Sequence, residues 1–171
     1  MNIIILQHIK IEDPGYIKDL MLADGLNLTT IELDEDEKIP NDLSKFDGMF
    51  CMGGPMDTYM EREYPWLIEE KKRIKEFVVD LKKPYLGFCL GCQLLGEVVG
   101  GKVVKSSPAG IGMMNINFTK EKNKDNLFSK FPDEIKSLQW HSYEVQGIEN
   151  NKNVTLLASS PSFFNVYIQN F

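Results

Sequence analysis

The sequence predicts a single α/β domain over residues 1–171, with a mostly parallel central sheet and a small antiparallel β extension. Two features of the chain indicate this fold class. The N-terminal part alternates short apolar runs with segments of helical periodicity, which is typical of parallel strands joined by helices. The C-terminal part consists mainly of short strand-like segments separated by polar residues. A chain of 171 residues and 19.6 kDa also fits one domain of ordinary size.

Continuous apolar runs, or an alternation of apolar and polar residues, predict four strands in the N-terminal part. They cover residues 3–6, 26–33, 48–52 and 85–88. The third run ends on Gly53-Gly54-Pro55. The backbone there is therefore expected to approach another group closely at the C-terminal end of a strand.

Apolar residues three or four positions apart predict three helices that alternate with these strands. They cover residues 16–23, 65–81 and 90–99. Gly25 ends the first helix, Pro65 suits the first turn of the second, and Gly100-Gly101 caps the third. The alternation of strand and helix favours parallel pairing of the strands.

The C-terminal part has a different pattern, which predicts five further strands and one short helix. The strands cover residues 102–105, 111–118, 135–145, 154–158 and 165–168, and the helix covers residues 126–131. A mixed or antiparallel extension beside the parallel core accounts for this pattern most economically.

Composition excludes several classes of function. The chain has 19 basic and 25 acidic residues, a formal charge of −6 and a pI near 5.0, which disfavours a nucleic-acid backbone as main partner. No apolar run approaches the ~20 residues of a membrane span, and the N-terminus lacks the cationic region of a signal peptide. Three cysteines in such a chain indicate a reducing compartment. We therefore expect a cytoplasmic protein with no nucleic-acid or membrane partner.

The segment Gly87-Phe88-Cys89-Leu90-Gly91 lies between an expected strand and an expected helix. In a strand-to-helix turn of the G-x-C-x-G type, the central residue has a strained backbone, and glycine on both sides avoids side-chain clashes. The sulfur then lies at a helix N-terminus, which favours the thiolate. The N–H of Leu90 points toward any oxyanion formed on an attacked carbonyl. The motif therefore predicts Cys89 as a nucleophile.

Two other interpretations of Cys89 remain open. The side chain could simply pack in the interior, although packing does not require glycine on both sides. Cys89 and Cys92 could also form a redox pair, although the flanking glycines have no role in such a site. A zinc site needs about four ligands, and the chain offers only one further cysteine, Cys51, and two well-separated histidines. We therefore expect no metal.

Residues 87–95 resemble the class I glutamine amidotransferase family, in particular its GMP-synthase-like stand-alone branch. Gly53-Gly54-Pro55-Met56 upstream and Tyr64-Pro65-Trp66-Leu67 between the two segments resemble it as well. Gly100-Gly101-Lys102-Val103 and Ile111-Gly112 also match, so the resemblance covers nearly the whole chain. It implies a flavodoxin-like three-layer sandwich with the site at the C-terminal edge of the sheet.

The resemblance also implies residue roles. Cys89 corresponds to the nucleophile that attacks the side-chain amide of glutamine, forms a γ-glutamyl thioester and releases ammonia. The backbone N–H groups of Gly54 and Leu90 correspond to the oxyanion hole. The residues expected to bind substrate are Gln93, His141, Ser142 and Tyr143. Ser142 and Tyr143 are expected to act through the backbone of a loop.

One part of the family pattern is missing. Family members complete a Cys-His-Glu triad with a His-x-Glu segment after a C-terminal strand, whereas neither His8 nor His141 is followed two residues later by glutamate. His8 is expected to be structural. Loss of the base commonly removes most of the catalysis. The chain is thus expected to be truncated after Phe171, a natural fragment, or a degenerate relative that binds without turnover. The retained Cys89, Gly54 and Gln93 favour the first two.

The expected activity is hydrolysis of glutamine to glutamate and ammonia. The alternatives are a γ-glutamyl peptidase or hydrolase on the same scaffold, and a non-catalytic relative that binds a partner. The chain contains no synthetase domain and no P-loop motif, so ammonia would pass to a separate synthetase subunit or to solvent, and no cofactor is expected. The sequence does not indicate the oligomeric state.

Overall fold

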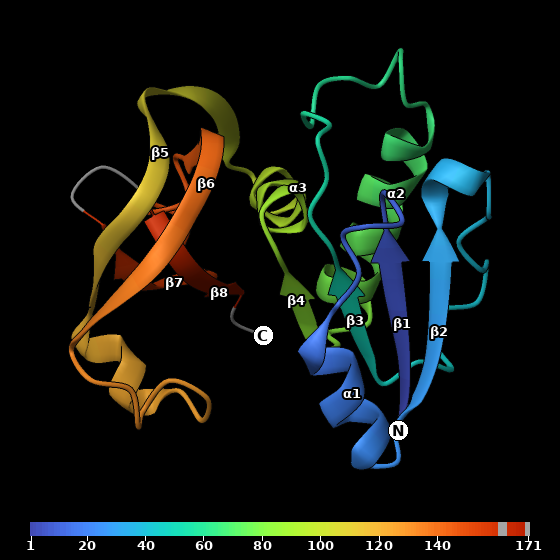
Figure 1. Ribbon diagram of the computed structural model, residues 1–171, viewed down its shortest axis with the longest axis horizontal. Coiled ribbons are helices and arrows are strands. Elements are labelled where there is room, and N and C mark those ends of the chain that lie inside the picture. The colour runs from blue at the N-terminus through green and yellow to red at the C-terminus, as the bar shows by residue number, and fades with distance from the viewer. Residues whose placement is uncertain (161–163, 170–171) are drawn as a thin grey trace. The chain divides into compact units, whose positions relative to one another are not determined.

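A computed structural model of the chain describes residues 1–160 and the strand at 164–169. Its contacts divide the chain into two compact units, Met1–Val98 and Val99–Phe171 (Figure 1). The first unit contains a parallel sheet with helices, and the second contains an antiparallel sheet. The single domain expected over residues 1–171 stays a prediction.

The sheet of the first unit has four parallel strands in the order β2-β1-β3-β4. They are β1 (Asn2–Gln7), β2 (Asn27–Glu32), β3 (Gly48–Cys51) and β4 (Tyr85–Gly87). Ile4, Ile5 and Leu6 of β1 are fully buried. A central parallel strand covered on both faces requires such a continuous apolar run, and the four strands predicted for this region are confirmed.

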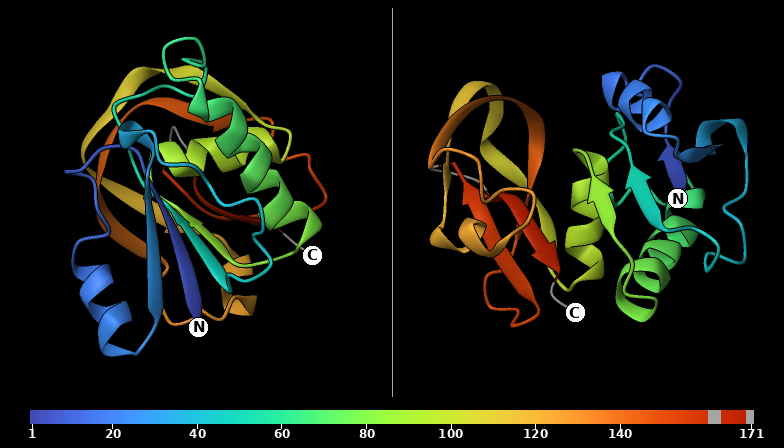
Figure 2. Two further views of the ribbon diagram at one scale, coloured as in Figure 1. Left: turned by 90° about the vertical axis from the view of Figure 1, so that its right-hand side faces the viewer. Right: turned by 90° about the horizontal axis from the view of Figure 1, so that it is seen from below.

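Helices cover both faces of this sheet (Figure 2). They are α1 (Tyr16–Ala23), α2 (Trp66–Lys75) and α3 (Leu90–Val98), with a short 3-10 turn η1 (Leu33–Glu35) and a π-helical segment η2 (Glu76–Asp80) that continues α2. Met21 of α1 packs against Ile3 and Ile5 on one face. On the other face α2 packs against α3. Among the described residues, no helix has the length and apolar character needed to cross a bilayer.

The second unit is a four-stranded antiparallel sheet in the order β6-β5-β7-β8. Its strands are β5 (Lys102–Phe118), β6 (Glu134–Gln146), β7 (Val154–Ser159) and β8 (Phe164–Gln169). The prediction of two separate strands at 102–105 and 111–118 was wrong, because one long strand, β5, covers both segments. Its pairing with β6 shifts between Lys105 and Gly110. This irregularity explains the break in the apolar pattern.

The helix predicted at residues 126–131 was also wrong. A 3-10 helix, η3 (Lys120–Lys124), precedes this segment, which itself forms turns. The carboxylate of Asp125 accepts hydrogen bonds from the backbone N–H groups of Leu127 and Phe128, at 2.9 and 2.8 Å. An aspartate side chain that bonds the following amides stabilises a turn and competes with helix formation.

A close backbone contact joins α3 to the end of β3. The N–H of Gly91 donates to the carbonyl of Met52 at 3.2 Å. A Cβ atom on Gly91 would lie 2.8 Å from the carbonyl carbon of Cys51 and closer still to its oxygen. Only glycine therefore fits this position in the first turn of α3, and the contact places the turn before α3 beside the loop that follows β3.

The substitution Gly91→Ala is expected to destabilise the protein by about 2–4 kcal/mol, because backbone atoms cannot move aside as a flexible side chain can. The comparison is Gly25→Ala: Gly25, just after the end of α1, has a positive φ of 73°, and nothing lies within 4 Å of an added Cβ. It should cost about 1 kcal/mol of backbone strain. Urea unfolding measures both losses, and equal losses would contradict the close contact.

Candidate active site

Cys89 lies in the turn between β4 and α3 with a φ of 48°. This left-handed region is uncommon for residues other than glycine, and such strain is concentrated at functional positions. A Cβ atom on Gly87 would lie 2.5 Å from the carbonyl carbon of Gly91, so the turn needs glycine on this side as well. The Cys89 side chain is exposed. The strained turn predicted from the G-x-C-x-G spacing is therefore present.

Burial and a neighbouring carboxylate raise the pKa of the Cys89 thiol. Loss of water around the sulfur raises the pKa of the thiol, the negative charge of Glu12 raises it further, and the N–H of Leu90 lowers it by a smaller amount. The effect of the Leu90 N–H has the sign expected for the start of α3, but burial and the charge of Glu12 outweigh it. No pattern in the sequence had indicated Glu12, which lies in the segment after β1.

The loop after β3 brings Gly53 and Gly54 beside this cysteine. A Cβ atom on Gly53 would lie 3.6 Å from the Cβ of Cys89 and would collide with the carboxylate of Glu12. A Cβ atom on Gly54 would lie 3.2 Å from Cδ2 of Leu90. Within the described ranges, no group accepts a hydrogen bond from the N–H of Gly54. The structure thus brings together Cys89, Gly54 and Leu90, as expected from the sequence.

The far end of this loop is held by a polar network. Thr58 is nearly fully buried, and its hydroxyl donates to Oε1 of Glu97 in α3 at 2.7 Å. The Nζ of Lys71 in α2 donates to the carbonyl of Thr58 at 2.7 Å and pairs with Oε2 of Glu97 at 2.8 Å. Because two helices hold the same loop residue, the loop that carries Gly54 is anchored on both sides.

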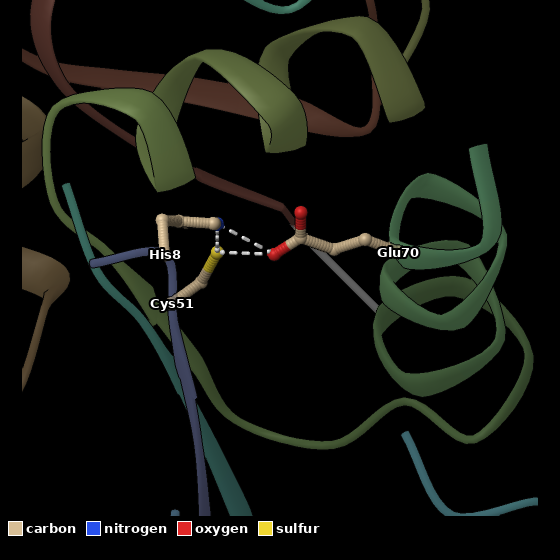
Figure 3. Close-up of side chains that lie close together, drawn as sticks. All are labelled: His8, Cys51 and Glu70. Atoms are coloured by element: carbon tan, nitrogen blue, oxygen red, sulfur yellow. Dashed lines mark hydrogen bonds and ion pairs between the residues drawn. The ribbon is translucent and has the colours of Figure 1, made fainter. Parts of the chain in front are cut away.

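Behind the loop lies a buried cluster of His8, Cys51 and Glu70, which we call the His8 cluster (Figure 3). The three residues come from the position directly after β1, the end of β3 and the middle of α2, and all are 0% exposed. His8 Nε2 lies 2.9 Å from Oε1 of Glu70, and the Cys51 thiol donates to the same oxygen at 3.3 Å. The other ring nitrogen of His8, Nδ1, lies 2.8 Å from the carbonyl oxygen of Gly53.

The protonation of the cluster follows from these contacts. A carbonyl oxygen only accepts, so Nδ1 of His8 carries a proton and donates it to Gly53. Burial alone would lower the pKa of His8, but the charge and hydrogen bond of Glu70, with the Gly53 carbonyl, outweigh it and raise that pKa. Burial and then the charge of Glu70 raise the pKa of Cys51 well above its usual range. His8 Nε2 and the Cys51 thiol are two donors on one carboxylate oxygen of Glu70, so the hydrogen bonds fit a charged His8–Glu70 pair with a neutral thiol.

Sequence reasoning missed Glu70, although a signal existed. Glu70 lies three residues after Leu67 and four before Ile74, and those two side chains are fully buried. An acid on the apolar face of an amphipathic helix needs a buried partner, and His8 is that partner.

The His8 cluster is also a group that could hold a metal ion. Its nitrogen, sulfur and oxygen donor atoms all lie within 4.8 Å of one another, and zinc accepts this donor set. Each of the three atoms is, however, already hydrogen-bonded inside the cluster. The hydrogen bonds among His8, Cys51 and Glu70 therefore explain why the three donor atoms lie close together, without a metal ion.

The remaining predicted residues lie in two different elements. Gln93 is in α3, one turn after Cys89, and its N–H donates to the Cys89 carbonyl at 3.0 Å. His141, Ser142 and Tyr143 lie inside β6, so the loop expected there was wrong. His141 Nδ1 lies 2.9 Å from the carbonyl oxygen of Tyr143. The substrate roles of these residues stay predictions.

Comparison with known proteins identifies the family. Residues 16–167 match the model of the class-I glutamine amidotransferase family. A protein of Picrophilus torridus, named as one of the subunits of a glutamine-hydrolyzing GMP synthase, is 32% identical over 109 residues, which is 64% of this chain and 53% of that protein. Gamma-glutamyl peptidase 3 of Arabidopsis thaliana is 30% identical over 124 residues, which is 70% of this chain and 48% of that protein. The chain thus spans about half the length of these two relatives.

The fold agrees with this match. A crystal structure of a glutamine amidotransferase from Thermotoga maritima superposes with a TM-score of 0.88 at 24% identity, covering 99% of this chain and 72% of that one. The flavodoxin-like α/β architecture expected from the sequence is confirmed. Since the family model matches most of the chain, this protein belongs to the class I glutamine amidotransferase family.

Proposed function

We propose that the chain hydrolyses the side-chain amide of glutamine, as the glutaminase part of a GMP-synthase-like amidotransferase. One observation carries this proposal: Cys89 is held at a positive φ at the start of α3, directly beside the Gly53-Gly54 loop. A nucleophile presented in this way beside backbone donors suits acyl transfer.

The reaction would proceed in two steps. In the first, Sγ of Cys89 bonds to the amide carbon and the carbonyl oxygen becomes an oxyanion; the C–N bond then breaks, and the nitrogen takes up the proton lost by the thiol and leaves as ammonia. In the second, water attacks the γ-glutamyl thioester, which releases glutamate and restores the thiol. The N–H groups of Gly54 and Leu90 would stabilise each oxyanion by about 3–4 kcal/mol per donor.

His8 is not the base of this reaction. It is 0% exposed, and both of its ring nitrogens are engaged, by Gly53 and by Glu70. A base must lie within hydrogen-bond reach of the proton that it removes. His8 therefore keeps a role away from the reacting atoms, consistent with its expected structural role.

Substrate and partner remain part of the proposal. Gln93, one turn after Cys89, is the candidate residue for positioning glutamine. The relative from Picrophilus torridus is named as one of several subunits, which supports transfer of ammonia to a separate synthetase partner, and the three free cysteines suit the reducing cytoplasm. The Arabidopsis thaliana relative favours γ-glutamyl peptides as the second candidate substrate.

The substitution Cys89→Ala is expected to lower the rate of glutamate release by at least ~1,000-fold, because covalent catalysis is lost. Cys92→Ala, the matched control on the same helix, should leave the rate within about twofold. Glutamate release is measured with free glutamine and with a γ-glutamyl dipeptide, which separates the two candidate substrates. Equal rates for the unmodified chain and Cys89→Ala would contradict the proposal, and loss only in Cys92→Ala would favour a redox pair.

The substitution Glu12→Gln is expected to accelerate alkylation of Cys89 by iodoacetamide about two- to fivefold at pH ~7. The charge of Glu12 raises the pKa of the thiol, so its removal lowers that pKa and increases the thiolate fraction. Asp19→Asn removes the same charge from an exposed position on α1 and should leave the rate unchanged. The rate is followed by mass spectrometry of the Cys89 peptide. An unchanged or slower rate in Glu12→Gln would show that Glu12 does not act on the sulfur.

A further inference from the structure

His8 holds the carbonyl group of the peptide bond between Gly53 and Gly54 through a hydrogen bond. This peptide bond is trans, because the cis bond of the described chain is at Ser107-Pro108. In a trans peptide the C=O and the N–H point in opposite directions. The carbonyl of Gly53 accepts from Nδ1 of His8, so the N–H of Gly54 points away from His8. That N–H has no acceptor within the described part of the chain.

We propose that His8 and Glu70 are positioning residues: they hold the Gly53–Gly54 peptide so that the N–H of Gly54 faces the reacting carbonyl at Cys89, and they strengthen this N–H as an oxyanion donor. This role deepens the proposed function and rests on it. Neither residue touches the substrate, since both are 0% exposed.

The packing around the loop supports a fixed orientation. A Cβ atom on Gly54 would lie 3.0 Å from the Cβ of His8 and 3.2 Å from Cδ2 of Leu90, so the loop is confined between these two residues. The indole of Trp66 stacks on the imidazole of His8, with ring centroids 5.5 Å apart and an interplanar angle of 21°. The imidazole therefore cannot swing away from Gly53 without displacing Trp66.

Charge adds to this orientation. The acids that face His8 are Glu70, which pairs with it from α2, and Glu12, which acts from the segment after β1; the Cys51 thiol is neutral. A cationic donor on a carbonyl makes a stronger hydrogen bond than a neutral one, and it polarises the peptide so that the N–H at the opposite end also donates more strongly. The Gly54 N–H lies at that opposite end.

Stability alone does not explain the pair. Removing two charges from water has a large unfavourable free energy, and well-packed apolar residues are often at least as stable. Oε2 of Glu70 is in addition buried without a hydrogen-bond partner among the described residues. A pair that is not optimised for stability, directly behind the Gly53–Gly54 peptide, is consistent with a role in the reaction.

The first test uses steady-state kinetics of glutamine hydrolysis with folded variants. His8→Leu should lower kcat about 10- to 100-fold and change KM by less than about threefold, because the donor is needed mainly for the oxyanion. His8→Asn places an amide N–H near the position of Nδ1 and should recover part of kcat. Cys51→Ala alters the same cluster without touching the Gly53 carbonyl and should stay within about twofold. An unchanged kcat in His8→Leu, or an equal loss in Cys51→Ala, would overturn the inference.

The second test uses pH. Glu70→Gln removes the charge that raises the pKa of His8, so the imidazole loses its proton at a lower pH than in the unmodified protein. The fall in kcat that accompanies loss of this charge should therefore begin at lower pH in Glu70→Gln. A purely structural role would not move the pH profile, and identical profiles would contradict the proposed polarisation.

A third measurement needs no turnover and separates the inference from the proposed function. In NMR spectra of the full chain, the imidazole of His8 should carry both protons at neutral pH, and Glu70→Gln should shift the amide resonance of Gly54. If the protein hydrolyses glutamine but the Gly54 amide does not respond, the inference fails alone. If the Gly54 amide responds but neither glutamine nor a γ-glutamyl peptide is hydrolysed, the proposed function is contradicted. The positioning role of His8 in that reaction is then contradicted as well.

Discussion

The candidate site depends on one close approach, in which Gly91 at the start of α3 lies against the backbone of Cys51 at the end of β3. The N–H groups of Phe88 and Gly91 donate to the carbonyls of Cys51 and Met52, at 2.9 and 3.2 Å. These contacts join the turn that carries Cys89 to the loop that carries Gly54. Two segments more than thirty residues apart in the sequence thereby form one site.

The site combines several features that do not favour stability by themselves. Cys89 has a positive φ, burial and then Glu12 raise the pKa of its thiol, and a charged pair is buried behind the Gly53 carbonyl. Strain and perturbed titration concentrate where a protein reacts rather than where it only folds.

The sequence predicted the parallel sheet, its helices and the turn at Cys89, because apolar periodicity and paired glycines report directly on strands, helices and close backbone contacts. It did not predict Glu70 or Glu12, since their effects arise from residues distant in the chain. It placed His141, Ser142 and Tyr143 in a loop, whereas long-range pairing with β5 keeps them in β6. Residues 126–131 form turns instead of the predicted helix, because the Asp125 carboxylate accepts hydrogen bonds from the two following backbone amides. The spacing of apolar residues does not reveal such hydrogen bonds. Phe171, after which truncation is expected, lies outside the described residues.

The most direct test of a nucleophile at Cys89 is to react the protein with 6-diazo-5-oxo-L-norleucine, an electrophilic mimic of glutamine, and to locate the adduct by mass spectrometry. We expect modification of Cys89 alone among the three cysteines, and protection by free glutamine. Comparable labelling of Cys92, or labelling that glutamine does not slow, would contradict the assignment of Cys89 as the residue that attacks the amide.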